Sequence, residues 1–213
     1  MTTDRGGRPY RSALREEQAE QTRLRIARAA RDRFVERGWA GTSVRSVATA
    51  AGVSEATVFA VYGSKAGLAL SLIDSADADA DTARALAELA AAGGDPHGQL
   101  AALVAFDRRL FEHGGEVIRV IVEGRRNEPA LADAYAEGRR RGDRNRRAVF
   151  ETWPDSAFRP GMTLDKALDV YALTISLDTY EIAVRERGWT PDAVEAWWIT
   201  SLGRAILSEK TPT

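Results

Sequence analysis

The feature of this sequence that most constrains its fold is a pair of short helical patterns that meet at Gly52. Glycine adopts a positive φ without strain, as a tight turn between two helices requires. Ser54 can then accept hydrogen bonds from backbone N–H groups as the N-cap of a second helix, expected over residues 55–61. The first pattern predicts a helix with one apolar face at i, i+3, i+4 and i+7, made by Val44, Val47, Ala48 and Ala51. The stretch is therefore interpreted as a helix-turn-helix.

A longer helix is expected before this pair, over residues 17–37. Ile26, Ala30 and Phe34 recur every four residues on one face, and Gly38 is placed to end the helix. Thr42 or Ser43 can cap the helix that follows. The two short helices can then cross over the longer one, which predicts a helix-turn-helix domain built on three helices.

Helical periodicity also dominates the rest of the chain, whereas alternation typical of strands is scarce. Breakers such as Gly114-Gly115 and the loop from Pro154 to Pro160 separate the expected elements. The further helices are predicted over residues 65–91, 97–113, 115–125, 127–152, 164–187 and 191–208. We therefore predict an all-α fold with a flexible basic arm (1–16), a helix-turn-helix domain (17–64) and a second helical domain (65–208).

Charged residues are distributed unevenly along the chain. Residues 1–65 carry 12 Lys and Arg against 7 Asp and Glu, whereas residues 66–213 carry 18 against 24. A basic N-terminal part suggests a polyanionic partner, although a net charge of this size is weak evidence alone. The absence of cysteine excludes disulfides and thiolate zinc sites. No apolar run approaches the roughly 20 residues of a membrane helix, and the polar start is unlike a secretory signal. We expect a cytoplasmic protein with no membrane partner.

The helix after Gly52 has the properties of one that enters the major groove of DNA, which is about 12 Å wide. Small and polar side chains should stand near its N-terminus, and Ser54, Glu55, Ala56 and Thr57 provide them. Capping hydroxyls and N–H groups at helix starts are good phosphate ligands. A structural pair of helices with no ligand is the alternative interpretation.

The order and spacing of motifs over residues 17–70 resemble the DNA-binding domain of the TetR family of transcriptional regulators. The matching segments are Phe34…Arg37-Gly38-Trp39, Thr42-Ser43-Val44-Arg45, Ala51-Gly52-Val53-Ser54, Thr57-Val58-Phe59 and Tyr62-Gly63-Ser64-Lys65. The resemblance implies that Thr42, Ser43, Arg45, Ser54, Thr57, Phe59 and Lys65 lie at or near DNA. It also implies that residues 17–64 form the DNA-binding domain and that residues 65–208 form a helical ligand-binding and dimerisation domain. The expected protein is a homodimer that pairs through its last two long helices on a pseudo-palindromic operator, and a repressor that a small-molecule ligand releases.

The sequence departs from the family at three positions. The family usually has Tyr at position 59 and often His or Tyr at position 61, and both residue types can donate to phosphate. Phe59 and Val61 cannot, which predicts weaker phosphate binding with no change in the bases that are read. Phe59 can instead press on a thymine methyl group. Gly67 stands where an acidic residue commonly completes a capping box.

Aromatic and aliphatic residues of the C-terminal helices are candidates for a ligand pocket, although the same residue types build cores. The candidates for the pocket are Phe106, Leu110, Ile118, Val122, Phe150, Trp153, Tyr171 and Ile175. The candidates for the dimer interface are Tyr180, Trp197, Trp198 and Leu202. Because adjacent helical residues face about 100° apart, one of the two tryptophans is expected in the core and the other at the interface.

Other functions have little support in the sequence. No nucleophile–base pair, glycine-rich phosphate loop or metal constellation is recognised, so neither an enzyme nor a cofactor or metal is predicted. An adaptor that kept the fold and lost DNA binding is an alternative, supported by Phe59 and Val61 alone. The arginines between Arg139 and Arg147 are interpreted as a solvated face with carboxylate partners, and less readily as an anion site.

Overall fold

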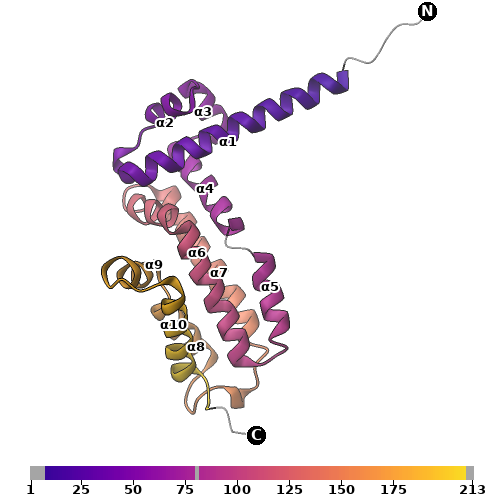
Figure 1. The fold of residues 1–213 in the computed structure, drawn as a ribbon, viewed down its shortest axis with the longest axis vertical. Helices are drawn as coiled ribbons and strands as arrows, with labels where there is room; N and C mark the ends of the chain where they lie inside the picture. Colours follow the sequence, from indigo (N-terminus) through magenta and orange to yellow (C-terminus); the bar gives the residue numbers. More distant parts are fainter. Residues whose placement is uncertain (1–7, 80–81, 210–213) are drawn as a thin grey trace, which may run out of the picture. The chain divides into compact units, whose positions relative to one another are not determined.

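The computed structural model describes residues 8–79 and 82–209. Over these residues the chain is helical with connecting loops, and its one β-bridge is an isolated pair between Phe158 and Leu207. The all-α fold is therefore confirmed (Figure 1). In the described ranges no helix is long and apolar enough to cross a membrane.

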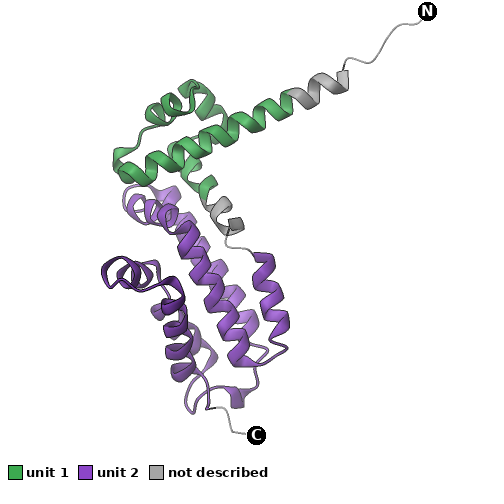
Figure 2. Ribbon diagram, in the orientation of Figure 1, with its two compact units in different colours: residues 1–72 green, residues 73–213 purple. Residues whose placement is uncertain are grey.

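The chain divides into two compact units, residues 1–72 and residues 73–213 (Figure 2). The first unit contains α1 (Arg8–Gly41), α2 (Val44–Ala51), α3 (Glu55–Tyr62) and the start of α4 (Lys65–Asp79). The boundary was expected at residue 64, but the first turns of α4 belong to the N-terminal core, where Ala66, Leu68 and Leu72 are buried. Apolar burial therefore places the boundary further along α4.

The three-helix domain forms as its apolar pattern predicts. Ile26, Ala30 and Phe34 of α1 are buried, as are Val47 and Ala48 of α2. Gly38, Gly52 and Gly63 all have positive φ, near 65–72°. Gly38 kinks the chain within the bounds of α1, and Gly52 and Gly63 end α2 and α3. Helix α1 begins at Arg8, well before the predicted start, and residues 1–7 of the expected arm lie outside the described residues.

The second unit contains the remaining helices. They are α5 (Thr82–Ala91), α6 (Pro96–Gly124), α7 (Pro129–Phe150), the 3₁₀ turn η1 (Asp155–Ala157), α8 (Leu164–Thr174), α9 (Leu177–Glu181), the π-helical segment η2 (Ile182–Glu186) and α10 (Pro191–Ile206). Helix α6 packs against α5, α7, α9 and α10. The core joins residues from α6 to α10, with Leu100, Tyr171, Val194 and Trp198 among its buried members.

Two predicted helix boundaries in this unit are wrong. A break at Gly114-Gly115 was expected, but α6 runs through both glycines. A Cβ atom at position 115 would lie 3.0 Å from Cδ1 of Leu177, so glycine lets α9 pack close. A glycine lowers helix propensity by only roughly 1 kcal/mol relative to alanine, so two glycines need not end a long, packed helix.

The helix predicted over residues 164–187 is interrupted at Ile175 and Ser176, which are both extended. The Ser176 hydroxyl accepts a hydrogen bond from the Thr179 N–H at 3.1 Å and so starts α9. The helix predicted over residues 65–91 is described as α4 and α5, and residues 80–81 lie outside the described ranges.

Candidate nucleic-acid interface

Helix α3 presents its N-terminal face to solvent. Ser54, Glu55 and Ala56 are exposed, and Thr57 is half-buried. Phe59 is 48% exposed, which is unusual for so large an apolar side chain. On the opposite face Val58 is buried in the three-helix core. One side of α3 therefore anchors the helix, and the other is open to a partner.

The start of α3 is held rigidly by its own side chains. The Ser54 Oγ accepts the Thr57 N–H at 3.1 Å and lies 2.9 Å from the Thr57 hydroxyl. These bonds satisfy part of the N-terminus and fix both side chains on the outer face. A hydroxyl group has one donor and two acceptor sites, so such a cap can also bind an external group.

The start of α2 is capped reciprocally and carries the most exposed arginine of the site. The Ser43 Oγ accepts the Ser46 N–H at 3.1 Å, and the Ser46 Oγ accepts the Ser43 N–H at 3.2 Å. The Arg45 side chain is 84% exposed and lies 3.8 Å from a Glu55 carboxylate oxygen. The structure thus brings Arg45 of α2 close to Glu55 of α3.

Thr42 was predicted to lie at or near DNA, but it is buried. It is only 3% exposed, and its Oγ1 lies 2.9 Å from the carbonyl oxygens of both Arg33 and Gly38. Its hydrogen is therefore donated within the domain, where it fixes the turn at Gly38. The sequence signal for this role is the spacing of four residues between Gly38, where the chain turns, and Thr42.

Lys65 also has intramolecular partners. Its Nζ donates to the carbonyl oxygen of Trp39 and lies 4.0 Å from the centre of the Trp39 ring. The side chain is half-buried at the first residue of α4. An ammonium group has three N–H donors, so the contact of Lys65 with DNA stays a prediction.

Tyr62, quoted only as part of the motif, fastens the end of α3. Its hydroxyl donates to the Arg23 carbonyl oxygen at 3.0 Å, and the Arg23 guanidinium lies 5.9 Å from the ring centre. Burial raises the pKa of the Tyr62 hydroxyl above its ordinary value, against the lowering effect of Arg23. Helix α3 is therefore held in place by buried Val58, by the Ser54 cap and by Tyr62.

The predicted pocket residues fall into two groups. Phe150, Trp153, Tyr171 and Ile175 are buried in the core of the second unit, whereas Phe106, Leu110, Ile118 and Val122 are half-buried on α6. Phe150 stacks on Trp153 at 4.2 Å and meets the edge of Tyr171 at 6.2 Å between ring centres.

A buried polar network beside these rings was missed by the sequence analysis. Asp107 accepts hydrogen bonds from Arg146 at 3.0 Å and from the Tyr171 hydroxyl at 2.8 Å. Burial opposes the charge of Arg146, but Asp107 and Tyr171 outweigh burial and raise its pKa. The arginine cluster does have carboxylate partners, since Arg140 and Arg144 pair with Glu137, yet Arg146 is not on a solvated face.

The prediction of the dimer interface is largely wrong, because most of its residues are not on the surface. Trp198 and Leu202 are fully buried and Tyr180 is nearly so, because all three pack into the core of their own subunit. Trp197 is 40% exposed and meets Trp189 edge to face at 5.8 Å. Of the two adjacent tryptophans, then, Trp198 is the core residue and Trp197 the surface residue.

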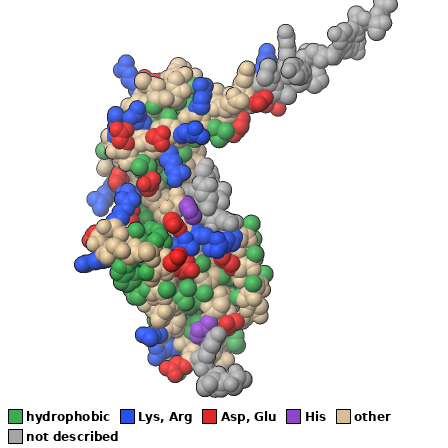
Figure 3. Space-filling model, in the orientation of Figure 1, with side chains coloured by type: hydrophobic (Ala, Val, Ile, Leu, Met, Phe, Trp, Pro, Cys, Tyr) green, Lys and Arg blue, Asp and Glu red, His purple; other side chains and the backbone are tan. Residues whose placement is uncertain are grey.

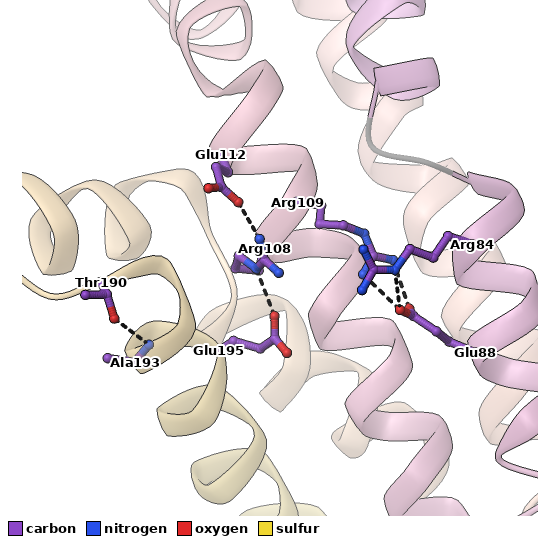
Figure 4. Close-up of polar contacts among 8 residues, drawn as sticks. All are labelled: Arg84, Glu88, Arg108, Arg109, Glu112, Thr190, Ala193 and Glu195. Atoms are coloured by element: carbon purple, nitrogen blue, oxygen red, sulfur yellow. Dashed lines mark hydrogen bonds and ion pairs between the residues drawn. The ribbon is translucent and has the colours of Figure 1, made fainter.

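Adjacent arginines on α6 point in opposite directions (Figure 4). Arg109 is buried and forms two hydrogen bonds with Glu88 of α5, at 2.9 and 3.2 Å. Arg108 pairs with Glu195 of α10 at 2.8 Å and with Glu112 of its own helix. These ion pairs tie α5 and α10 to α6.

Several large apolar side chains of the second unit are exposed. Figure 3 shows hydrophobic side chains grouped on the visible face of this unit, whereas charged side chains dominate the visible face of the first. The large apolar side chains exposed in this unit are Leu86 of α5, Leu173 of α8, Ile182 of η2, Trp189 before the start of α10 and Trp197 within α10. Such a grouping on an otherwise polar surface is typical of an interface.

Residues 26–72 match the model of a family described as bacterial regulatory proteins, tetR family. No curated protein sequence matches the chain.

Three solved structures illustrate the likeness of the fold. NalD of Pseudomonas aeruginosa, the secondary repressor of the MexAB-OprM multidrug efflux pump, is 20% identical, with a TM-score of 0.69 over 91% of this chain and 100% of NalD. A protein of Saccharomonospora viridis, described as a transcriptional regulator and solved with choline, is 19% identical, with a TM-score of 0.72 over 89% of this chain and 100% of its own. A Rhodococcus protein described as a TetR-family regulator is 13% identical, with a TM-score of 0.66 over 87% and 98%.

Proposed function

Because this chain belongs to the TetR family of bacterial regulatory proteins through its N-terminal domain, we propose that it represses transcription by binding a pseudo-palindromic operator as a homodimer. A small-molecule effector releases it from DNA. It acts in the cytoplasm, and no catalytic role is assigned to it.

The observation that carries this proposal is the outward face of α3. Ser54, Glu55 and Ala56 are exposed on a helix whose other side is anchored by Val58 and whose end is fastened by Tyr62. A rigid helix with small polar residues at its N-terminus fits the major groove. Arg45 and Ser43 stand beside it, where they can bind phosphates.

The dimer is proposed from the exposed apolar residues of the second unit. Leu173 of α8 is 83% exposed, and Ile182, Trp189 and Trp197 are each exposed by about two fifths. Tryptophan is favoured at interfaces, and a two-fold interface uses the same patch on both subunits. A dimer would place its two α3 helices on half-sites about 34 Å apart, one turn of DNA.

The effector is proposed to bind in the second unit near Trp198. Its indole N–H is buried and has no hydrogen-bond partner among the described residues. An unpaired buried donor costs roughly 1–3 kcal/mol, which an acceptor on a ligand would recover. Phe111 and Tyr180 lie about 6 Å from its ring and would pack against the body of such a ligand. An effector that prefers another arrangement of the helices shifts the population away from DNA.

The test of DNA binding is selection of bound sequences from a random DNA pool. We expect enrichment of a two-fold symmetric site with half-sites one helical turn apart. Ala56→Glu adds a carboxylate to the exposed face of α3 and should abolish enrichment, whereas Leu86→Glu makes the same change on exposed α5 and should not. No enrichment by the folded wild-type protein would refute the proposal and favour the adaptor alternative.

Choline is a useful first probe of the effector site, since the related Saccharomonospora viridis protein was solved with it. We expect choline to weaken binding to the selected DNA, and Trp198→Phe to remove this response while DNA binding persists. A response that is unchanged in Trp198→Phe would place the effector elsewhere.

A further inference from the structure

A hollow of about 450 Å³ lies on the surface of the N-terminal unit, where α1 and α2 pack against each other. Its volume falls within the range of small-molecule sites, roughly 300–1,000 Å³. A stable protein interface uses roughly 20–30 residues on each side, whereas this hollow has eight. Its size therefore favours a small molecule as the occupant. The lining residues are Leu24, Arg25, Arg28, Ala29, Asp32 and Arg33 of α1 and Ala50 and Ala51 of α2.

Small apolar side chains form the base of the hollow. Ala29 and Ala51 are each 8% exposed, and Ala50 is exposed beside them. A single methyl group at each of these positions leaves space between the two helices that longer side chains would fill. Leu24 is 60% exposed and adds a larger apolar surface. This part of the hollow can therefore cover the apolar body of a ligand.

The charged side chains of the hollow are mainly basic. Three arginines and one aspartate give the lining two more positive than negative charges. Arg33 pairs with Glu36 at 2.8 Å, and Arg25 lies 3.5 Å from the Thr22 hydroxyl. Arg28 is exposed and has no hydrogen-bond or ion-pair partner among the described residues. A guanidinium group binds a carboxylate with two parallel hydrogen bonds, so Arg28 is available to an anionic group.

We propose that the hollow is a binding site for a small amphipathic anion, a carboxylate on an alkyl or aryl body. The carboxylate pairs with Arg28, and the apolar body lies over Leu24 and the three alanines. All the lining residues belong to the N-terminal unit, so this site is separate from the effector site proposed near Trp198. The inference does not rest on the proposed DNA binding.

Thiol protection tests the site directly, because the sequence contains no cysteine. Ala50→Cys places one thiol in the hollow, and mass spectrometry of the full chain follows its alkylation by iodoacetamide, a neutral reagent. Octanoate should slow this alkylation to a saturable limit. Octylammonium, which has the same chain and the opposite charge, should not.

Thr49→Cys is the matched control, since Thr49 is exposed on α2 and does not line the hollow. Octanoate should leave its alkylation rate unchanged. An unchanged rate for Ala50→Cys, or equal slowing of both thiols, would overturn the proposal.

Two further comparisons, made in Ala50→Cys, test the charged and the apolar part of the site. Arg28→Gln should weaken the binding of octanoate up to about fivefold, as expected for an exposed ion pair. Arg37→Gln removes an exposed arginine of α1 that does not line the hollow and should have no effect. Hexanoate should bind more weakly than octanoate by about two- to fourfold for each methylene group removed. Equal effects of the two arginine substitutions, or equal binding of the two carboxylates, would contradict the proposal.

Duplex DNA distinguishes this site from a phosphate contact. Slower alkylation of Ala50→Cys with the selected operator, together with no protection by octanoate, would assign the arginines to the DNA backbone and overturn the inference. If the protein binds no DNA, the proposed function fails, whereas protection of the thiol by octanoate still supports this site.

Discussion

Replacement of Asp107 by alanine should strongly destabilise the second unit. The Asp107 carboxylate is nearly buried and accepts hydrogen bonds from Arg146 and from Tyr171, at 2.8 to 3.2 Å. Removal of one partner of a buried ion pair costs roughly 3–5 kcal/mol, because the other charge is left uncompensated. Asp143 lies 3.2 Å from Arg146 and retains part of the compensation. We therefore expect a loss of about 3 kcal/mol.

The assay is urea unfolding followed by circular dichroism, with thermal unfolding alongside. A loss of about 3 kcal/mol corresponds to a fall of about 6–12 °C in Tm for a chain of this size. Tyr171→Phe removes one hydrogen bond to a charged group and should cost about 1.5–3 kcal/mol. The double variant Asp107→Leu with Arg146→Met replaces both charges and should be more stable than Asp107→Ala. A cost below about 1 kcal/mol for Asp107→Ala would refute the reasoning.

Three further predictions concern single groups. Thr42→Val should lower the unfolding free energy by about 1 kcal/mol, because a buried donor to the Arg33 and Gly38 carbonyls is lost. Thr42→Ser keeps the hydroxyl and should keep most of the stability. Equal unfolding free energies of the two variants in urea would contradict this role. Gly67→Ala should lower the Tm, since its Cβ would collide with the Tyr62 carbonyl oxygen; an unchanged Tm would count against this close approach. Burial, and secondarily Asp107, raise the pKa of the Tyr171 hydroxyl well above its ordinary value. Its contribution to stability is therefore complete below about pH 10 and is lost as the pH rises toward the folded-state pKa, so the alkaline fall in unfolding free energy should be smaller in Tyr171→Phe.

The N-terminal domain could be predicted closely because its signals are local. Apolar spacing in α2, the glycines at positions 38, 52 and 63 and the capping serines at 43, 54 and 64 each act within a few residues. The exposed polar start of α3 at Ser54 was expected from the sequence itself, whereas Phe59 was placed near DNA only by the family resemblance. The roles of Thr42 and Lys65 did not follow, because their partners Arg33 and Trp39 are set by tertiary packing.

The second unit was harder to predict because contacts distant in sequence decide it. Gly115 lies inside α6 because Leu177 packs against it, and nothing near Gly115 in the sequence shows this. Trp197 and Trp198 are adjacent and of the same residue type, so the sequence does not show which of them is buried. The packing of α10 against α6 places Trp198 in the core and leaves Trp197 exposed. The Asp107–Arg146 pair joins helices far apart in the chain and has no local signature.

The central claim, that α3 is the element offered to DNA, is tested most directly by site-specific photo-crosslinking. Benzoylphenylalanine placed at position 59, on the exposed face of α3, should form a covalent crosslink to the selected operator under illumination. The same group at position 86, which is exposed on α5, should form none. Bound DNA that is crosslinked from position 86 and not from position 59 would contradict the account.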